Sequence, residues 1–405
     1  VGVDVFFVIS GYLMTRIICT GLERGSFGLW QFYVARGRRI IPTLLVLCAV
    51  LLIGGWWFLF PFEYESLGAA TGAALFFVSN VHLWQSAGYF DTASHQKWLL
   101  HTWSLAVEWQ FYLLLPIVLW GIWRAKLKRH VFLLVLLGVI ASLTWSVITT
   151  QAHPVLAFYS LPTRAWELLI GGLVFLSEGY GLIKRLQVWG KAVEAVGLIL
   201  IAASVYGYST GTPWPSAWAA APVLGAALVL MAARPASIWT GNRAAQWLGT
   251  TSYSLYLWHW PLAVLLNYLS WNNNPWVIAL ALAGSVLLGY LSWRWVEEPT
   301  HHIKGWSTGK TAGLLLAATL VVYAGATTVK LKKGMRKARL PKAVEQLAEG
   351  AFDTNPRRDE CLKFNVPTAE CRYGGKELGV IVTGDSHADA MVQAVAAALP
   401  SKNQH

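Results

Sequence analysis

Long apolar runs separated by short polar segments dominate the first 330 residues of the chain. About 20 apolar residues, at ~1.5 Å per residue in a helix, cross the hydrocarbon core of a bilayer. Ten runs reach or approach this length, at about 1–20, 40–60, 98–122, 130–149, 163–178, 192–208, 217–233, 251–269, 276–297 and 311–328. The pattern therefore predicts an α-helical polytopic membrane protein with about ten transmembrane helices.

Basic residues fall in alternate loops between these runs. The rich loops and their edges hold Arg16, Arg24, Arg36, Arg38, Arg39, Arg124, Lys126, Lys128, Arg129, Lys184, Arg185, Lys191, Arg234, Arg243, Lys304 and Lys310. The loops at 61–97, 150–162, 209–216 and 270–276 hold only Lys97. Positive charge marks cytoplasmic loops, so the rich set is predicted to be cytoplasmic. The alternation requires that a shorter run, 69–84, does not cross, and we interpret it as re-entrant or interfacial.

Composition agrees with a membrane protein. The 405 residues are 56% hydrophobic and 13% charged, and 23 of them are tryptophan, a residue that favours membrane interfaces. The net charge of +12 does not indicate nucleic-acid binding, because the basic residues sit mostly in short loops between apolar runs. The chain begins at Val1 without an initiating methionine and ends soon after a strand-like run, so we interpret it as part of a longer protein.

A polar stripe interrupts the run at 98–122. His101, Ser104 and Glu108 follow at i, i+3 and i+7, which places them on one helical face. His101 and Glu108 lie roughly 10 Å apart along such a helix, too far for a direct hydrogen bond. Ionisable residues inside a membrane helix are costly and indicate function, and the alternative is a polar contact between helices.

Three further polar groups are candidates. Arg36, Arg38 and Arg39 precede the second run and suit a cytoplasmic phosphate ligand, or they only signal topology. Ser252, Tyr256 and His259 form another stripe, which is either functional or structural. Arg164 and Glu167, at i and i+3, are most simply explained as an intrahelical ion pair. Snorkelling or capping explains the charged residues at the end of the 276–297 run, Arg294, Glu297 and Glu298.

After the last apolar run the chain becomes polar. A basic linker, residues 330–342, is predicted to lie outside the membrane by alternation, although its charge opposes that side. Cys361 and Cys371 have the spacing of a disulfide rather than a metal site, and no metal is expected. Cys19 and Cys48 are predicted to be packing residues. Residues 379–387 predict a buried strand and a glycine turn that exposes Ser386 at the start of a helix.

Several blocks, in order, resemble the acyltransferase-3 membrane O-acyltransferases. They are Gly2–Leu13, Phe32–Pro42, His101-Thr-Trp-Ser-Leu-Ala-Val-Glu108, Ser252-Tyr-Ser-Leu-Tyr-Leu-Trp-His259 and Glu297-Glu-Pro299. Gly384-Asp-Ser-His387 is similar to the first block of a fused SGNH-hydrolase-type domain. The resemblance implies four parts: a transmembrane acyltransferase domain at 1–300 without its first helix, a linker helix at 301–330, a periplasmic extension at 331–378, and the start of an SGNH-like domain at 379–405.

The resemblance also implies a function. Family members transfer an acyl group, usually acetyl, from a cytoplasmic acyl-CoA such as acetyl-CoA to a surface polysaccharide such as lipopolysaccharide O-antigen, or to a lipid-linked glycan, and bind no cofactor. They are multi-pass proteins of the bacterial inner membrane with a periplasmic C-terminal domain. Arg36 and Arg39 match the donor-side motif, and Arg38 lies between them. His101 and Glu108 match the polar helix, and Ser386 matches a nucleophile whose own backbone N–H joins the oxyanion hole.

The sequence departs from this family pattern in four places. The family's first helix, with an important histidine, is absent from this sequence. Trp109 stands where the family often has a glutamate, the SGNH glycine and asparagine donors are missing, and no Asp-x-x-His follows Ser386. We therefore expect the chain to need residues beyond its two ends. The alternatives are a proton-coupled transporter or flippase that uses Glu108 and His101, and an outward-facing esterase built around Ser386.

Overall fold

The computed structural model describes residues 1–87, 94–181, 186–209, 211–301, 306–345, 355–361, 371, 373 and 380–398. Within these residues the regular structure is helical and no strand occurs. The chain divides into two compact units, Val1–Gly334 and Met335–His405.

The first unit is a bundle of helices, and every predicted apolar run contains one. They are α1 (Gly2–Glu23), α2 (Leu29–Phe58), α3 (Pro61–Leu75), α4 (Ser79–Ser86), α5 (Thr102–Arg124), α6 (Val131–Ala152), α7 (Pro154–Tyr159), α8 (Leu161–Ser177), α10 (Gly190–Gly207), α11 (Ala220–Ala232), α12 (Arg243–Tyr268), α13 (Pro275–Ser292), the π-helix η5 (Trp293–Glu297), α14 (Glu298–His301) and α15 (Thr308–Leu331).

Within the described part of the chain, seven helical stretches are long and apolar enough to cross a membrane. They are Gly2–Glu23, Leu29–Phe58, Thr102–Arg124, Lys128–Ala152, Gly190–Gly207, Pro275–Thr300 and Thr308–Leu331. The other three predicted runs form α8, α11 and α12. Of these, α8 has 17 residues and α11 has 13, so both are short for a full crossing.

The ambiguous run at 69–84 is not one continuous helix. It is divided between α3 and α4 by a turn in which Phe77 has a positive φ of 54°. The Phe77 ring stacks on Trp109 of α5 with centroids 4.5 Å apart, so the turn is packed against the bundle. This break agrees with the interpretation that the run does not cross as a simple span.

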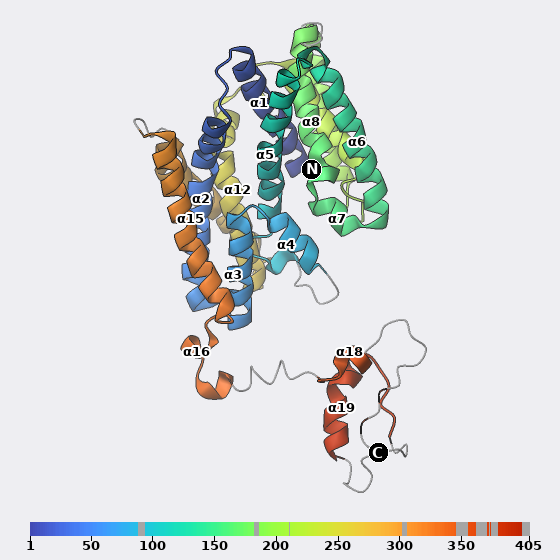
Figure 1. Ribbon diagram of the computed structural model, residues 1–405, viewed down its shortest axis with the longest axis vertical. Helices are drawn as coiled ribbons and strands as arrows, with labels where there is room; N and C mark the ends of the chain where they lie inside the picture. Colours follow the sequence, from blue (N-terminus) through green and yellow to red (C-terminus); the bar gives the residue numbers. More distant parts are fainter. Residues whose placement is uncertain are drawn as a thin grey trace. The chain divides into compact units, whose positions relative to one another are not determined.

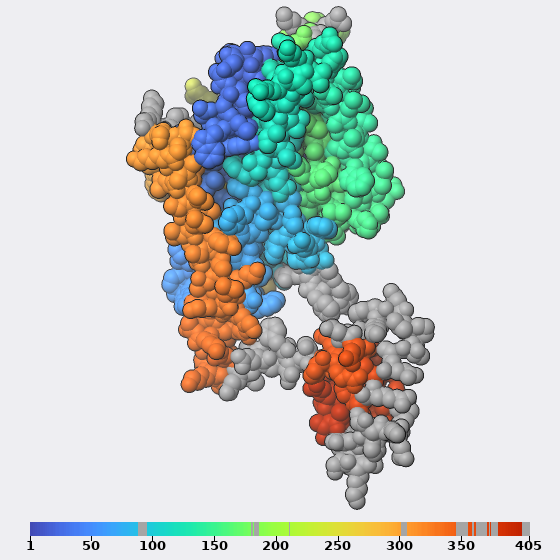
Figure 2. All heavy atoms as spheres, in the orientation of Figure 1, coloured from blue at the N-terminus to red at the C-terminus, as the bar shows by residue number. Residues whose placement is uncertain are grey.

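Two groups of helices flank α5 (Figure 1). One group contains α1, α6, α8, α10 and α11, and the other contains α2, α3, α12, α13 and α15. Helix α5 contacts α1 and α8 of the first group and α2 of the second. The polar stripe of α5 therefore lies at the centre of the unit, and Figure 2 shows α15 covering one outer side.

The bundle has two distinct ends in Figure 1. We call one the basic end, because the α1–α2 and α5–α6 connections that carry Arg24, Arg124 and Arg129 lie there. The α2–α3 connection and the start of α5 lie toward the opposite end. This arrangement follows the alternation of charge along the sequence.

Close backbone contact joins α1 to α8. A Cβ on Gly11 would lie 1.8 Å from the Leu168 carbonyl oxygen, and one on Gly171 would lie 1.9 Å from the Val8 carbonyl oxygen. No larger residue fits at either position without moving the backbone. Small residues at such crossings let membrane helices approach closely.

The second unit contains α16 (Arg336–Arg339), α18 (Arg358–Cys361) and α19 (Ser386–Ala398). Cys361 and Cys371 form a disulfide. The prediction of a buried strand before Ser386 is wrong for the described residues 380–383, which form no strand, and Val380, Ile381 and Val382 are exposed. A strand needs a neighbouring strand for its backbone hydrogen bonds, and the described residues supply none.

Candidate active site

Glu108 is the centre of a buried polar cluster on α5. Only 3% of the residue is exposed. Ser10 Oγ of α1 donates a 2.6 Å hydrogen bond to Glu108 Oε1, and the Tyr112 hydroxyl donates to the same oxygen. Tyr112 reaches it because residues at i and i+4 share a helical face. The carboxylate is thus held by two hydroxyl groups, and Ser10 Oγ and Tyr112 Oη lie 2.7 Å apart.

Two arginines of α2 face this cluster. Arg36 and Arg39 both interact electrostatically with Glu108, and Arg36 also interacts with Tyr112. Arg36 Nε is buried and has no hydrogen-bond partner among the described residues. Because α2 begins at Leu29, these side chains belong to the helix itself and not to the loop that the sequence suggested.

Arg38 points elsewhere, because consecutive residues of a helix diverge by about 100°. Its Nε and one terminal nitrogen each lie 3.4 Å from the Thr300 carbonyl oxygen. Arg38 therefore connects α2 to α14, while Arg36 and Arg39 face Glu108. The structure therefore separates the three predicted donor-binding arginines: Arg36 and Arg39 act on Glu108, and Arg38 contacts α14.

Glu297 is a second buried carboxylate near the same arginines. It lies in η5, is 5% exposed, and accepts a 2.7 Å hydrogen bond from Ser254 Oγ of α12. Arg39 acts on it electrostatically. Snorkelling or capping is therefore the wrong explanation for Glu297. Sequence reasoning missed this contact because nothing in the sequence marks a π-helical turn, which shifts the direction of the side chains.

The opposite part of the α5 stripe forms an aromatic and histidine cluster. The His101 ring packs against Tyr256, His259 and Trp260, with centroids 5.2, 5.9 and 6.3 Å apart. Tyr256 donates to the His101 carbonyl, and its hydroxyl lies 2.6 Å from Ser104 Oγ. The two predicted stripes, on α5 and α12, therefore meet here.

His101 itself is buried and comes directly before the helix, as its N-cap. Neither ring nitrogen makes a well-formed hydrogen bond within the described residues, although the Leu257 backbone interacts with the ring. His259 is exposed and its Nδ1 lies 2.6 Å from the Tyr256 carbonyl oxygen. Ser252 does not join this cluster: it is exposed and donates to the Gly249 carbonyl of its own helix.

Arg164 and Glu167 form the predicted intrahelical pair, with a third member from α1. Arg164 Nη1 lies 2.6 Å from Glu167 Oε1 and 2.8 Å from Asp4 Oδ1. All three residues are 1% exposed or less. The rings of Trp103 and Phe158 lie 5.2 and 5.4 Å from the guanidinium carbon and cover it. Asp4 was missed as a partner because it is 160 positions away.

In the second unit, Ser386 is the first residue of α19. Gly384 before it has a φ of 154°, a conformation that favours glycine, as predicted for the turn. Asp385 Oδ1 accepts hydrogen bonds from the His387 backbone N–H at 2.9 Å and from its ring at 3.0 Å. These bonds hold the pKa of the Asp385 carboxyl below its usual value. The His387 ring is thus paired with Asp385 rather than with Ser386.

No cluster of three or more histidine, cysteine or acidic side chains suited to a metal occurs within the described residues. The predicted polar residues of the membrane helices that meet in the described part of the first unit lie in the Glu108 cluster with the α2 arginines, in the His101 cluster, and in the Arg164 triad of Asp4, Arg164 and Glu167.

Comparison with known proteins assigns the first unit. The sequence profile of the acyltransferase domain matches residues 1–294. The chain is 30% identical to the peptidoglycan O-acetyltransferase OatA of Listeria monocytogenes over 317 residues, which cover 74% of this chain and 51% of that protein. It is 29% identical to the putative peptidoglycan O-acetyltransferase YrhL of Bacillus subtilis over 366 residues, 80% of this chain and 57% of YrhL.

A third relative is the putative membrane-bound transacylase BcsY of Komagataeibacter xylinus, 28% identical over 332 residues, which are 79% of this chain and 82% of BcsY. The chain spans about half the length of the OatA and YrhL relatives. No solved structure matches it. The family profile covers most of the chain, and its range contains the Glu108 cluster, the His101 cluster and the Arg164 triad. The chain belongs to the acyltransferase-3 family of membrane proteins.

Proposed function

We propose that this protein transfers an acyl group, most simply acetyl, from an acyl-CoA to a hydroxyl group of a cell-surface polysaccharide. The observation that carries the proposal is the line of polar groups along α5, from Glu108 through Ser104 to His101, which we call the polar route, with arginines at one end and histidines at the other. Relatives named as O-acetyltransferases support the reaction type.

On the donor side, Arg36 and Arg39 bind the phosphates of the acyl-CoA. They lie on the part of α2 nearest the basic end, which the charge pattern predicts to be cytoplasmic. Guanidinium groups suit phosphate oxygens because they donate two parallel hydrogen bonds. When no donor is bound, the carboxylates of Glu108 and Glu297 balance the positive charge of the two arginines.

In the chemical step the thioester C–S bond breaks and an ester C–O bond forms. The hydroxyl that first receives the acyl group, that of Ser386, loses its proton, and the CoA thiolate gains one, so CoA is released as a thiol. In the second transfer the acyl–Ser386 ester bond breaks as the glycan ester forms, and the glycan hydroxyl returns a proton to Ser386. Glu108, held by Ser10 and Tyr112, is positioned to accept and return this proton. His101, with no well-formed hydrogen bond at its ring, serves proton transfer at the other end of the route.

Transfer ends on the periplasmic side of a bacterial inner membrane, in an SGNH-like domain that contains Ser386. The position of Ser386 at the first turn of α19, after the glycine turn, supports a role as nucleophile. In the full-length protein, Ser386→Ala should reduce glycan acetylation at least about 10²-fold, because it removes the nucleophile. Unchanged acetylation would exclude the serine step, and Ser401→Ala is a matched control.

The decisive experiment uses the full-length protein in proteoliposomes supplied with acetyl-CoA labelled in the acetyl group. We expect label in the glycan and release of free CoA in equal amounts. Movement of a glycan without label transfer or CoA release would instead establish the transporter or flippase alternative. Purified peptidoglycan fragments and lipopolysaccharide O-antigen, offered separately, distinguish the two acceptor classes.

A further inference from the structure

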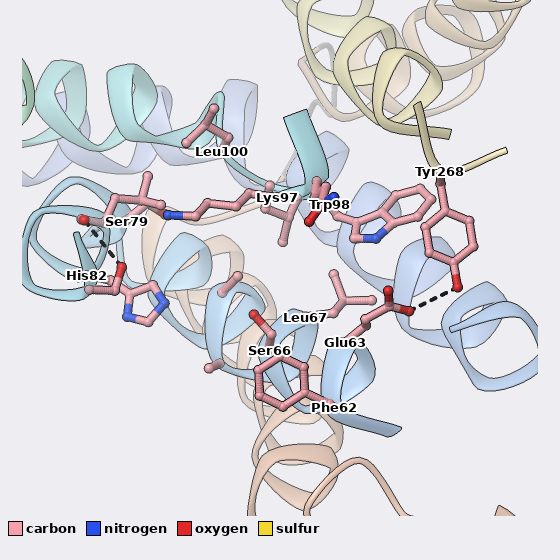
Figure 3. Close-up of a pocket in the computed structure, with 16 residues that line it drawn as sticks. Phe62, Glu63, Ser66, Leu67, Ser79, His82, Lys97, Trp98, Leu100 and Tyr268 are labelled. Atoms are coloured by element: carbon pink, nitrogen blue, oxygen red, sulfur yellow. Dashed lines mark hydrogen bonds between the residues drawn. The ribbon is translucent and has the colours of Figure 1, made fainter. Parts of the chain in front are cut away.

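A cavity of about 520 Å³ opens between α3, α4, the segment before α5 and the end of α12 (Figure 3). Its size lies in the range of small-molecule sites, about 300–1,000 Å³. It is lined by both aromatic and polar side chains. Those that matter here are Phe62, Glu63, His82, Lys97, Trp98 and Tyr268.

Two aromatic rings form one wall of the cavity. The Trp98 and Tyr268 rings lie 6.1 Å apart and are inclined at 56°. Tyr268 donates a 3.0 Å hydrogen bond to Glu63 Oε2, which also accepts from the Phe60 backbone N–H at 3.0 Å. These bonds fix the carboxylate beside the rings. An aromatic face next to a fixed carboxylate suits a pyranose, which has apolar C–H faces and a rim of hydroxyl donors.

The cavity borders the His101 cluster. Lys97 and Leu100 line it, and the Lys97 carbonyl accepts a 2.8 Å hydrogen bond from Trp260, whose ring packs on His101. On another side, Ser79 of the cavity wall accepts a 2.8 Å hydrogen bond from Thr102, the residue after His101. A ligand in the cavity would therefore lie beside the end of the polar route that is remote from Arg36 and Arg39.

We propose that this cavity binds a pyranose unit of the acceptor glycan and presents its hydroxyl to the His101 end of the route. The inference rests on the proposed acyltransferase function and adds the place where the acceptor binds. Trp98 provides the stacking surface, and Glu63 accepts hydrogen bonds from the sugar. Figure 3 shows the Lys97 side chain extending from beside Trp98 toward Ser79, where its ammonium group can donate to sugar oxygens. A lipid chain matches this site less well than a sugar, because it offers no polar groups to Glu63 and Lys97 in the lining.

The test uses the full-length protein in nanodiscs with N-acetylchitotetraose, a chain of four N-acetylated pyranoses, as the probe. Binding is measured by saturation-transfer-difference NMR, and the KM of the same probe is measured as acceptor with acetyl-CoA. Trp98→Ala should raise that KM about tenfold and reduce the NMR signal, because the stacking surface is lost. The KM for acetyl-CoA should stay within about twofold of the wild type, because the donor arginines are unchanged.

Two further variants make the result specific. Glu63→Gln keeps the shape of the cavity and should raise the acceptor KM several-fold. Trp57→Ala removes a tryptophan that is 69% exposed and outside this cavity, and should change nothing. Size-exclusion chromatography confirms that each variant is folded.

The outcomes separate the two proposals. NMR binding that requires Trp98 and Glu63, in a protein that transfers no acetyl group, would reject the proposed reaction and keep the sugar site. Transfer by the wild type, with probe binding and acceptor KM unchanged in both variants, would overturn the sugar site alone. The sugar site would also be overturned if N-acetylchitotetraose gave no NMR signal while phospholipid gave a signal that is lost in Trp98→Ala.

Discussion

Two buried acidic clusters contact the same helix, α1, and they are stabilised in opposite ways. Asp4 and Glu167 are paired with Arg164 at 2.8 and 2.6 Å, and aromatic rings cover the guanidinium. Among the described residues Glu108 forms no direct ion pair; it is held by the hydroxyl groups of Ser10 and Tyr112, with arginines at longer range.

The difference separates a structural site from a chemical one. A charge pair enclosed by aromatic rings has no room for a substrate and joins α1 to α8, beside the glycine contact of the same helices. A carboxylate held by neutral hydroxyls can exchange a proton without breaking a direct ion pair. We therefore expect mutations in the Arg164 triad to affect stability first, and mutations around Glu108 to affect turnover first.

The largest expected effect is on stability. Arg164→Leu removes the guanidinium that Asp4 and Glu167 share and leaves Glu167 buried without a counter-charge, which should lower the free energy of unfolding by about 3–5 kcal/mol. Thermal unfolding in detergent, followed by circular dichroism, measures the loss. A variant as stable as the wild type would remove the distinction between the two clusters. Arg129→Leu, in the α5–α6 connection, is the matched control.

Glu108→Gln should instead lower turnover about 10²-fold, because the amide cannot accept the proton, while hydrogen bonds from Ser10 and Tyr112 can still form. Labelled acetyl transfer in proteoliposomes measures kcat, and the melting temperature shows whether the bundle is intact. If Glu108→Gln lowered the melting temperature as much as Arg164→Leu does, and left kcat per folded molecule unchanged, Glu108 would have a structural role as well.

Arg39→Ala tests the longer-range cations of the Glu108 cluster. Its loss should raise the KM for acetyl-CoA about tenfold, because one phosphate contact disappears. Arg38→Ala is the comparison within the same helix, since Arg38 contacts the Thr300 carbonyl. If Arg39→Ala and Arg38→Ala raised the KM for acetyl-CoA equally, the conclusion that Arg39 but not Arg38 belongs to the donor site would be wrong.

The smallest effect concerns Asp385, an exposed carboxylate of the second unit. The His387 N–H groups lower the pKa of the Asp385 carboxyl. The carboxylate therefore stays charged, and caps the start of α19, at pH values at which an ordinary aspartate is already protonated. The sign follows from the lowered pKa: the stabilisation is complete above the unfolded pKa and is lost as the pH falls through the folded value. NMR titration of Asp385 measures this, and an ordinary pKa would contradict the cap.

The positions of the apolar helices could be predicted from hydrophobic runs, because each run must bury its backbone polar groups within its own helix. The charge alternation likewise predicted which connections share an end of the bundle. Helix boundaries were less accurate, as at α2, which starts at Leu29 and includes the arginines assigned to a loop. Local spacing also predicted that His101, Ser104 and Glu108 share a face, and that Arg164 pairs with Glu167.

The partners of these residues depend on the tertiary structure. Asp4 joins Arg164, Ser10 joins Glu108, Ser254 joins Glu297, and Tyr256 joins His101 and Ser104 across separations that no helical period encodes. The same holds for the cavity beside His101, whose lining comes from α3, α4, α12 and the segment before α5. The sequence alone determined which segments are apolar helices and which faces carry polar groups, since both follow from local periodicity. Only the packing of the helices decided which polar groups meet, because close contacts such as that between Gly11 and Leu168 set how the helices cross.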